Sequence, residues 1–222
     1  MQNKKKLVIA VDGPAGSGKS TVSKIVAEEL GIMYIDTGAM YRALTLKAMR
    51  LGLKLEDEGS LINLAMATSV DLKEKNGCLN VLLDGEEVSK LIRTPELTNN
   101  VKFIARVACV RAQMVKLQRA IGERSGAVLE GRDIGTVVFP DADYKFYLDA
   151  DVKERAHRRH KELVETGRKS SLEEIARDVV IRDESDMKRS VGALKVAPGA
   201  VVIDTTHLTI DQVAEKLLSY IK

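Results

Sequence analysis

The chain has 222 residues, which fits one domain, or one domain with an insertion, and disfavours two unrelated full domains. With 45% apolar and 30% charged residues, its composition is typical of a globular protein with a sizeable core and excludes a fibrous or wholly disordered chain. The formal charge of +3 is too small to favour a nucleic-acid coat or a membrane surface.

The lengths of the hydrophobic runs and the spacing of the cysteines limit where the protein is expected to reside and what it is expected to bind. The apolar run at 7–11 is shorter than the roughly 7–15 residues of a signal-peptide core, and no run reaches the roughly 18 of a membrane span. Cys78 and Cys109 stand apart without metal-ligand spacing. Aromatic residues make up only 4% and are not interleaved with basic ones. We therefore expect a cytoplasmic protein with no membrane and no nucleic-acid partner.

Five short hydrophobic segments lack polar alternation, as expected of strands buried on both faces of a parallel sheet. They cover residues 6–11, 33–36, 127–130, 145–149 and 200–204. Segments with helical periodicity, such as 22–30, 40–51 and 210–221, lie between or after them. The alternation predicts an α/β fold whose core is a five-stranded parallel sheet flanked by helices.

The middle of the chain breaks this rhythm. Residues 69–91 alternate between apolar and polar, and the turn dipeptides Asn76-Gly77 and Asp84-Gly85 are hairpin signals. We expect a small antiparallel β insertion here. The amphipathic pattern over 96–124 predicts two helices that meet near residues 106–109.

Residues 13–20 read GPAGSGKS and match the phosphate-binding motif G-x-x-x-x-G-K-[ST], directly after a predicted strand and before a predicted helix. Glycines let backbone N–H groups curl around an anion, and the helix N-terminus adds its dipole. Lys19 is expected to neutralise phosphates and Ser20 to ligate Mg²⁺. The alternative is a Gly-rich turn that happens to precede a helix. The predicted ATP site comprises Gly13, Pro14, Ala15, Gly16, Ser17, Gly18, Lys19, Ser20 and Thr21.

A phosphate loop does not name a reaction. The chain has neither an N-K-x-D guanine motif nor a D-x-x-G switch motif, which disfavours a GTPase. The run 179–184 approaches a motor-type hydrophobic strand closed by Asp-Glu, but Arg182 interrupts it and the segment reads better as helix.

Two arginines follow predicted strands and should reach the same sheet edge as the phosphate loop. Arg42 lies in the helix after residues 33–36, and Arg132 follows residues 127–130. A guanidinium donates two parallel hydrogen bonds to phosphate, so the pair suits a second phosphate-bearing substrate. The alternative is two surface ion pairs, Arg42 with Asp36 and Arg132 with Asp133.

A basic stretch follows at 153–161. Its Arg155, Arg158 and Arg159 have the spacing of one helical face, and Arg168 and Lys169 come soon after. A basic flap of this kind supplies charge and excludes water when it closes over a transferring phosphoryl group. A solvated helix face, or a weak nucleic-acid patch, is the alternative.

Several of these segments together resemble bacterial cytidylate kinases. The resemblance rests on GPAGSGKS, on DTGAMYR at 36–42, on GRDIGTVVFP at 131–140, on ERAHRR at 154–159 and on RDESD at 182–186, and it runs from about residue 6 to the end. It implies ATP-dependent phosphorylation of CMP and dCMP with Mg²⁺. It also implies a P-loop core at 1–68 and 106–222, a short helical lid at about 153–188 and a nucleoside-monophosphate-binding insertion at 69–105.

The resemblance also implies roles for individual residues. The CMP site would comprise Thr37, Arg42, Arg111, Arg132, Asp133, Arg182, Asp186 and Arg189. Within it, Arg42, Arg132 and Arg189 would hold the phosphate, Arg182 and Asp186 the sugar hydroxyls, and Arg111 and Asp133 the cytosine. The implied catalytic residues are Lys19, Arg132, Arg158 and Arg159. The chain departs from many relatives at Lys102 and Ala108, where they carry Ser and Pro, and more mildly at Glu130, where some relatives carry Asp.

Two other functions remain open at this point. One is another P-loop kinase for small acceptors, such as a UMP/CMP kinase, and the other is a nucleotide-dependent regulatory switch that uses the insertion as its partner surface. An acceptor without phosphate would leave Arg42, Arg132 and Arg189 without a shared target. We expect the protein to be a monomer.

Overall fold

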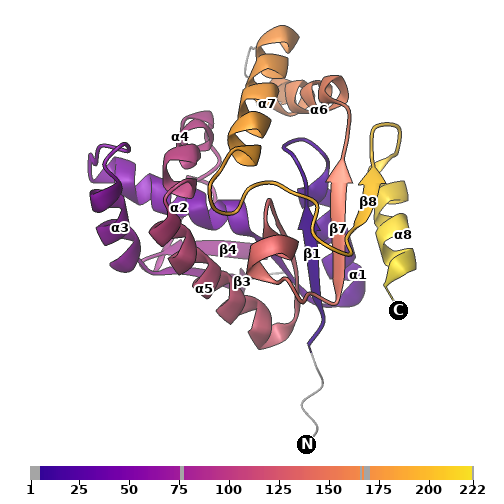
Figure 1. Cartoon of the computed structure of the whole chain (residues 1–222), viewed down its shortest axis with the longest axis horizontal. Helices are drawn as coiled ribbons and strands as arrows, with labels where there is room; N and C mark the ends of the chain where they lie inside the picture. The colour runs from indigo at the N-terminus through magenta and orange to yellow at the C-terminus, as the bar shows by residue number, and fades with distance from the viewer. Residues whose placement is uncertain (1–5, 76–77, 166, 168–170, 222) are drawn as a thin grey trace, which may run out of the picture.

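A computed structural model describes residues 6–75, 78–165, 167 and 171–221 of the chain. Strands and helices alternate through most of this length (Figure 1). In chain order the elements are β1 (Val8–Asp12), α1 (Lys19–Leu30), β2 (Met33–Asp36), α2 (Thr37–Arg50), α3 (Glu58–Met66), β3 (Val70–Lys75), β4 (Cys78–Leu83), β5 (Glu86–Glu87), α4 (Pro95–Ala105), α5 (Ala108–Ser125), β6 (Ala127–Gly131), the π-helical turn η1 (Ile134–Val138), β7 (Tyr144–Asp149), α6 (Val152–Glu165), α7 (Leu172–Met187), β8 (Val201–Asp204) and α8 (Ile210–Tyr220).

The five predicted strands form one parallel sheet in the order β2-β6-β1-β7-β8. β1 lies in the centre, where Asp12 is level with Gly131 of β6 on one side and with Tyr147 of β7 on the other. All five strands run in the same direction, so the loops that follow them meet at one edge. The prediction of a five-stranded parallel sheet is confirmed.

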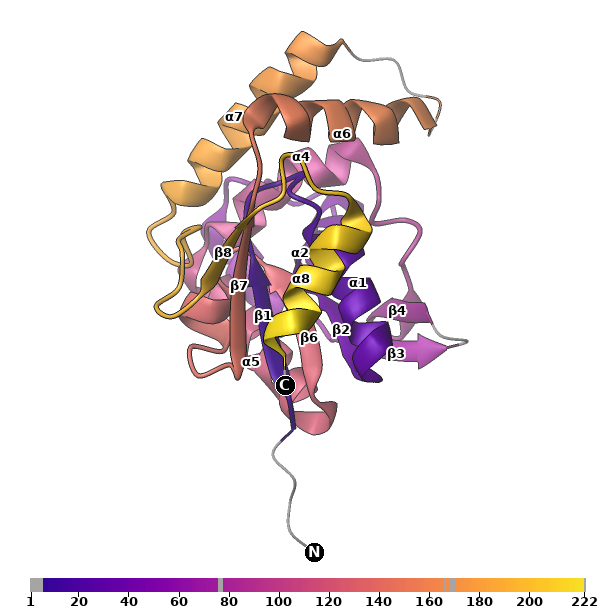
Figure 2. The same ribbon diagram turned by 90° about the vertical axis from the view of Figure 1, so that its right-hand side faces the viewer.

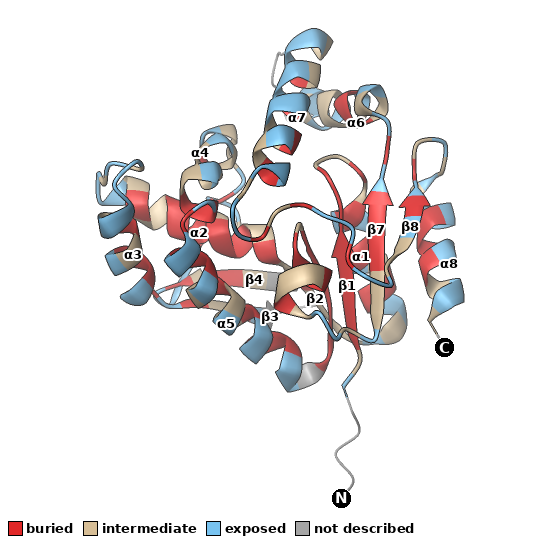
Figure 3. Cartoon of the chain, viewed as in Figure 1, coloured by how far each residue is buried: buried red, intermediate tan, exposed pale blue. Residues whose placement is uncertain are grey.

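Two apolar cores cover the two faces of the sheet. On one face α1 and α8 pack against the strands through side chains such as Val22, Val26 and Leu217. On the other face α2 and α5 contribute Leu44 and Met114 to a larger core. Figure 3 shows the central strand β1 as buried and the outer faces of the helices as exposed. Burial on both sides explains the continuous apolar runs of β1 and β6, whereas the edge strands β2 and β8 are only partly buried.

The predicted antiparallel insertion is also present. β3 pairs with β4 and β4 with β5, and Val70 lies opposite Leu83. The predicted turn at 84–85 connects β4 and β5, whereas Asn76-Gly77 lies outside the described residues. Val70 and Leu83 belong to the same apolar core as α2 and α5, so the insertion shares the core of the main body. The boundaries 69–105 remain a prediction.

Helices α6 and α7 form a hairpin that lies above the edge where the parallel strands end (Figures 1 and 2). Ile175 and Val179 of α7 pack with Ala156 of α6 in a small core of their own. Because a separate core holds the two helices together, the hairpin is one unit of structure. Its position matches the predicted lid, and lid movement remains a prediction.

Candidate active site

The phosphate loop connects β1 to α1 as the motif predicts. Gly13 has a φ of +148°, and a Cβ there would collide with the carbonyl oxygen of Leu148 in β7. Gly18, at the start of α1, has a φ of +88°. Both backbone shapes exclude ordinary side chains, which explains why glycine stands at these positions. The loop therefore presents its backbone and the N-terminus of α1 to the edge of the sheet.

Lys19 is the first residue of α1, and its side chain is buried against the loop. Its Nζ donates hydrogen bonds to the Pro14 carbonyl oxygen at 2.5 Å and to Ser17 Oγ at 3.3 Å. Burial, followed by the nearby charge of Arg132, lowers the pKa of Lys19 to about 7. The nearby carboxylates Glu130 and Asp12 act in the opposite direction but do not outweigh burial and Arg132.

Ser20 faces an acid that the sequence did not place in the site. Its hydroxyl donates a hydrogen bond to Glu130 Oε1, at the end of β6. The Tyr34 hydroxyl donates to the same oxygen at 2.9 Å, and burial raises the pKa of Tyr34. The signal available in the sequence was the acid that closes the hydrophobic strand at 127–130. A carboxylate beside the phosphate-loop hydroxyl follows from the pairing of β6 next to β1.

Asp36 begins α2 and holds Arg42. One carboxylate oxygen accepts a hydrogen bond from the Ala39 amide at 2.9 Å and the other accepts one from Arg42 Nη2 at 2.8 Å. Burial opposes the charge of Asp36, but Arg42 and the amide leave its pKa below the ordinary value. The Thr37 hydroxyl donates to the Glu130 carbonyl oxygen at 2.8 Å, which fixes the turn beside β6. The ion pair of Arg42 with Asp36, which was the alternative to a phosphate contact for Arg42, is present in the structure.

Asp186 of α7 accepts from two arginines of the predicted acceptor site. Arg132 Nε donates to its Oδ2 at 2.7 Å, and Arg189 forms an ion pair with its Oδ1. The sequence alternative, in which Arg132 pairs with its neighbour Asp133, is wrong. Consecutive residues at the end of β6 diverge, so Arg132 turns to α7 while Asp133 turns to α5.

Arg182 is half-buried near other cations. Burial, followed by the charge of Arg132, lowers its pKa to about 10, and Arg42 and Arg159 act in the same direction. Within the described ranges Arg182 forms no ion pair, whereas the arginines around it do. Five arginines and Lys19 thus converge at one edge of the sheet, where an anion would relieve their repulsion.

Arg111 and Asp133 form a buried ion pair beneath the segment that leaves α7. Arg111 Nη2 donates to Asp133 Oδ2, and the two side chains are only 2% and 8% exposed. Arg111 also lies over the ring of Tyr41, with 5.5 Å between the guanidinium carbon and the ring centroid. Gly192, with a φ of +66°, lies so close that a Cβ would collide with both members of the pair. Sequence reasoning missed Gly192, because its importance depends on residues 59 or more positions away.

The three arginines of the predicted flap have different surroundings. Arg155 is buried, and it contacts the Ala15 carbonyl oxygen at 3.2 Å and Asp183 at 2.5 Å. Arg158 donates to the Thr205 carbonyl oxygen at 2.6 Å and lies near the Gly16 carbonyl oxygen. Arg159 is partly exposed. A shared basic face is therefore the wrong description for Arg155, which holds α6 on the phosphate loop. Arg168 and Lys169 lie outside the described residues.

A phosphate loop at the centre of this sheet, with arginines from α2, β6 and α7 beside it, defines a P-loop kinase whose acceptor carries a phosphate. The comparisons name the family. The profile described as "Cytidylate kinase" matches residues 9–222. The chain belongs to the cytidylate kinase family, which makes it a nucleoside monophosphate kinase that uses ATP.

Individual relatives agree with this family. A cytidylate kinase of Clostridioides difficile is 49% identical over 215 residues, which cover 97% of this chain and 98% of the relative. A cytidylate kinase of Geobacillus thermodenitrificans is 45% identical over 217 residues, which cover 98% of this chain and 97% of the relative. The crystal structure of an uncharacterized protein from Eubacterium ventriosum has a TM-score of 0.51 at 12% identity, covers 97% and 98% of the two chains, and supports the fold alone. Over the described residues, no helix has the length and apolarity needed to cross a membrane.

Proposed function

We propose that the protein transfers the γ-phosphoryl group of ATP to CMP and dCMP. One observation carries the proposal: Lys19 of the phosphate loop lies beside several buried or half-buried arginines, and burial first, then the charge of Arg132, lowers the pKa of both Lys19 and Arg182. Such repulsion is tolerated where phosphates bind. The loop between β1 and α1 supplies a place for the donor, and the arginines supply one for the acceptor phosphate.

The chemistry asks for positioning and charge. An oxygen of the CMP phosphate attacks the γ-phosphorus in line with the departing ADP, and this oxygen is already ionised, so no general base is needed. Lys19 and Arg132 stabilise the negative charge that spreads over the transferring group. Arg158 and Arg159 of α6 are proposed to add charge from the hairpin above. Phosphates bound at Lys19 would also return its pKa toward the ordinary value.

Mg²⁺ fits the oxygen atoms around Ser20. The Ser20 hydroxyl and the Glu130 carboxylate are in contact at the start of α1, and hard oxygen ligands are those that Mg²⁺ prefers. We propose that Ser20 holds the ion directly and that Glu130 fixes its water ligands. When bound, the ion would neutralise charge on the β- and γ-phosphates.

Cytosine would be read by Asp133 together with Arg111. An ionised carboxylate only accepts hydrogen bonds, so it suits the amino group of cytosine and disfavours the carbonyl oxygen of uracil. The pair is buried and arginine fixes the carboxylate, so an unmatched base would leave a polar group without a partner. Such a mismatch costs about 1–3 kcal/mol, which corresponds to roughly tenfold to a hundredfold in selectivity.

The test measures ADP release with CMP, dCMP, UMP, AMP and GMP as acceptors. We expect CMP and dCMP to be preferred, and Asp133→Asn to narrow the CMP-over-UMP ratio of kcat/KM chiefly by losing CMP activity. Equal losses with both acceptors would mean that Asp133 supports the site without reading the base. ATP binding without turnover of any monophosphate would favour the regulatory switch.

We further propose a cytoplasmic monomer. Light scattering of the purified protein measures its mass in solution. We also expect the specific activity to stay constant as the protein is diluted.

A further inference from the structure

Asp12, the last residue of β1, is buried and contacts backbone amides of another segment. It is 2% exposed. Its two carboxylate oxygens accept hydrogen bonds from the amides of Ile134 and Gly135, both at 2.8 Å. These are the first two residues of η1, which begins directly after Asp133. Asp12 therefore links the strand before the phosphate loop to the segment that carries the proposed cytosine contact.

The geometry at Asp133 shows what this link achieves. The first amides of a helical turn have no partner within the turn, and the residue just before it normally caps them with its own side chain. Asp133 occupies that position but makes no side-chain cap hydrogen bond. Its carboxylate instead pairs with Arg111. Asp12 satisfies the amides from outside, which leaves the Asp133 carboxylate free to face α5.

We propose that Asp12 is a positioning residue for cytosine selection: by capping η1 it keeps the Asp133 carboxylate paired with Arg111 and away from the amides of its own helix. Without Asp12 those amides would lose their acceptor, and Asp133 occupies the position from which a side chain normally caps them. It would turn to them and leave Arg111. This inference rests on the proposed reading of cytosine by Asp133.

Burial disfavours the charged form of Asp12, so we expect a neutral residue of the same size to be tolerated by the fold. Burial raises its pKa to about 6, although the two amides act in the opposite direction. Asp133 adds to the rise, and Lys19 opposes it. Asp12→Asn keeps the size and removes this charge, but it leaves one amide facing an NH₂ group. Should Asp12→Asn fail to give a native near-ultraviolet spectrum, Asp12→Ser, which keeps one acceptor, takes its place.

The experiment is a double-mutant cycle in full-length protein at saturating ATP. The variants are Asp12→Asn, Asp133→Asn and the double variant, each tested with CMP and UMP. The expected result is a fall of about tenfold in the CMP-over-UMP ratio for Asp12→Asn, with the KM for ATP changed less than about twofold. In the Asp133→Asn background, Asp12→Asn should have no further effect on the ratio, because it acts through the missing carboxylate.

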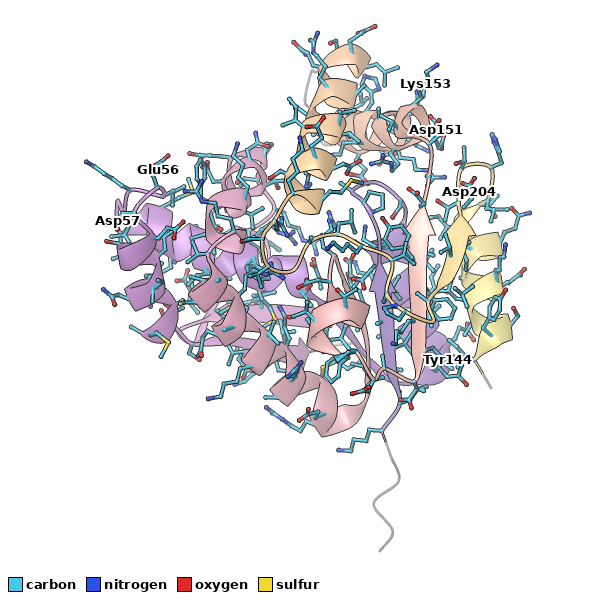
Figure 4. The ribbon with its side chains drawn as sticks, viewed as in Figure 1. Glu56, Asp57, Tyr144, Asp151, Lys153 and Asp204 are labelled. Atoms are coloured by element: carbon cyan, nitrogen blue, oxygen red, sulfur yellow. The ribbon has the colours of Figure 1, made fainter. Side chains whose placement is uncertain are left out.

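Asp57→Asn provides the matched control. Asp57 also caps a helix through its carboxylate, at the exposed start of α3 on the outer side of the molecule (Figure 4). This variant should leave the ratio unchanged. If Asp12→Asn lowers activity with both acceptors equally, or if the two effects on the ratio add, the positioning role is overturned.

A second readout separates this inference from the proposed function. In the substrate-free protein, the Arg111 guanidinium protons should exchange slowly in nuclear magnetic resonance spectra, and Asp133→Asn should abolish their signal. Asp12→Asn should abolish it as well. If Asp133→Asn leaves the base ratio unchanged, reading of cytosine fails, and the signal still decides whether Asp12 holds the pair. Persistence of the signal in Asp12→Asn overturns the inference.

Discussion

Arg155 of α6 and Asp183 of α7 form a buried ion pair, with 2.5 Å between Nη1 and Oδ2. The same guanidinium donates to the Ala15 carbonyl oxygen of the phosphate loop and to the Ala150 carbonyl oxygen before α6. One arginine therefore connects both helices of the hairpin to the loop that receives the phosphates. Because Arg155 is buried and has several hydrogen-bond partners, we expect it to contribute to the free energy of unfolding.

Arg155→Met should destabilise the protein by about 3–5 kcal/mol, because Asp183 would remain as an uncompensated buried charge. Chemical denaturation measures this loss. Arg159→Met is the matched control: its ion pair with Glu162 is exposed, so the expected loss is about 0–1 kcal/mol. Arg159→Met should instead lower kcat. A stable Arg155→Met protein with slow turnover would show that Arg155 acts on the phosphates after all.

Lys19→Met should lower kcat by at least about a hundredfold, because it removes charge that acts most strongly on the transferring phosphoryl group. It should also change the pH dependence of stability in the ligand-free protein. The folded pKa of Lys19 is about 7 against an ordinary 10.5, so between these values the unfolded chain binds more protons. Stability therefore rises with pH across this window.

Denaturation between pH 7 and 10 tests this sign. The wild-type slope should be absent in Lys19→Met and retained in Lys54→Met, which replaces an exposed lysine far from the loop. An identical slope in all three proteins would mean that Lys19 is not desolvated in the free state.

Glu130→Gln should raise the Mg²⁺ concentration needed for half-maximal activity by roughly tenfold or more, as for other residues that position metal ligands. Calorimetry provides a readout without turnover: Mg²⁺ should strengthen ATP binding in the wild type and much less in the variant. Without Mg²⁺, the variant should bind ATP at least as tightly, since a carboxylate that repels phosphate is gone. Unchanged Mg²⁺ dependence would remove Glu130 from the metal site.

Tyr34→Phe tests the same hydrogen-bonded group of Ser20, Tyr34 and Glu130 with a smaller change. It removes one donor to Glu130 and leaves the Ser20 hydroxyl in place. We expect a smaller shift in Mg²⁺ dependence than for Glu130→Gln. Tyr220→Phe, at an exposed position on α8, is the control and should match the wild type.

Gly192→Ala should lower kcat/KM for CMP by about tenfold or more, because its Cβ would displace both Arg111 and Asp133. Gly199→Ala is the matched control: its φ of +75° carries the same backbone penalty, but nothing lies within 4 Å of the added Cβ. Both variants should lose stability. Only Gly192→Ala should lose more CMP activity than its fraction of unfolded protein explains. Titration of the active sites with CMP gives the number of sites that still bind.

Local sequence patterns were enough to predict the sheet, the insertion and the phosphate loop. Short apolar runs with no alternation, bounded by turn residues, favour strands of a parallel sheet, and a glycine motif placed between such a strand and a helix indicates a phosphate site. Local chemistry of this kind predicted the sheet, the antiparallel insertion and the loop with Lys19 and Ser20. The ion pair of Arg42 with Asp36 could also be anticipated from the sequence, because Asp36 caps the helix that contains Arg42 and the two lie six residues apart.

The partners of the other charged residues depend on how the strands and helices pack together. Neighbours in sequence, Arg132 and Asp133, turn to different helices, and Arg155 leaves the basic face that its spacing predicted. Glu130 meets Ser20 because β6 lies beside β1, a pairing between strands more than a hundred residues apart. Ion pairs over such distances depend on strand order and helix packing, which no local pattern encodes. The physical reason is that a charged side chain settles where the fold supplies its counter-charge.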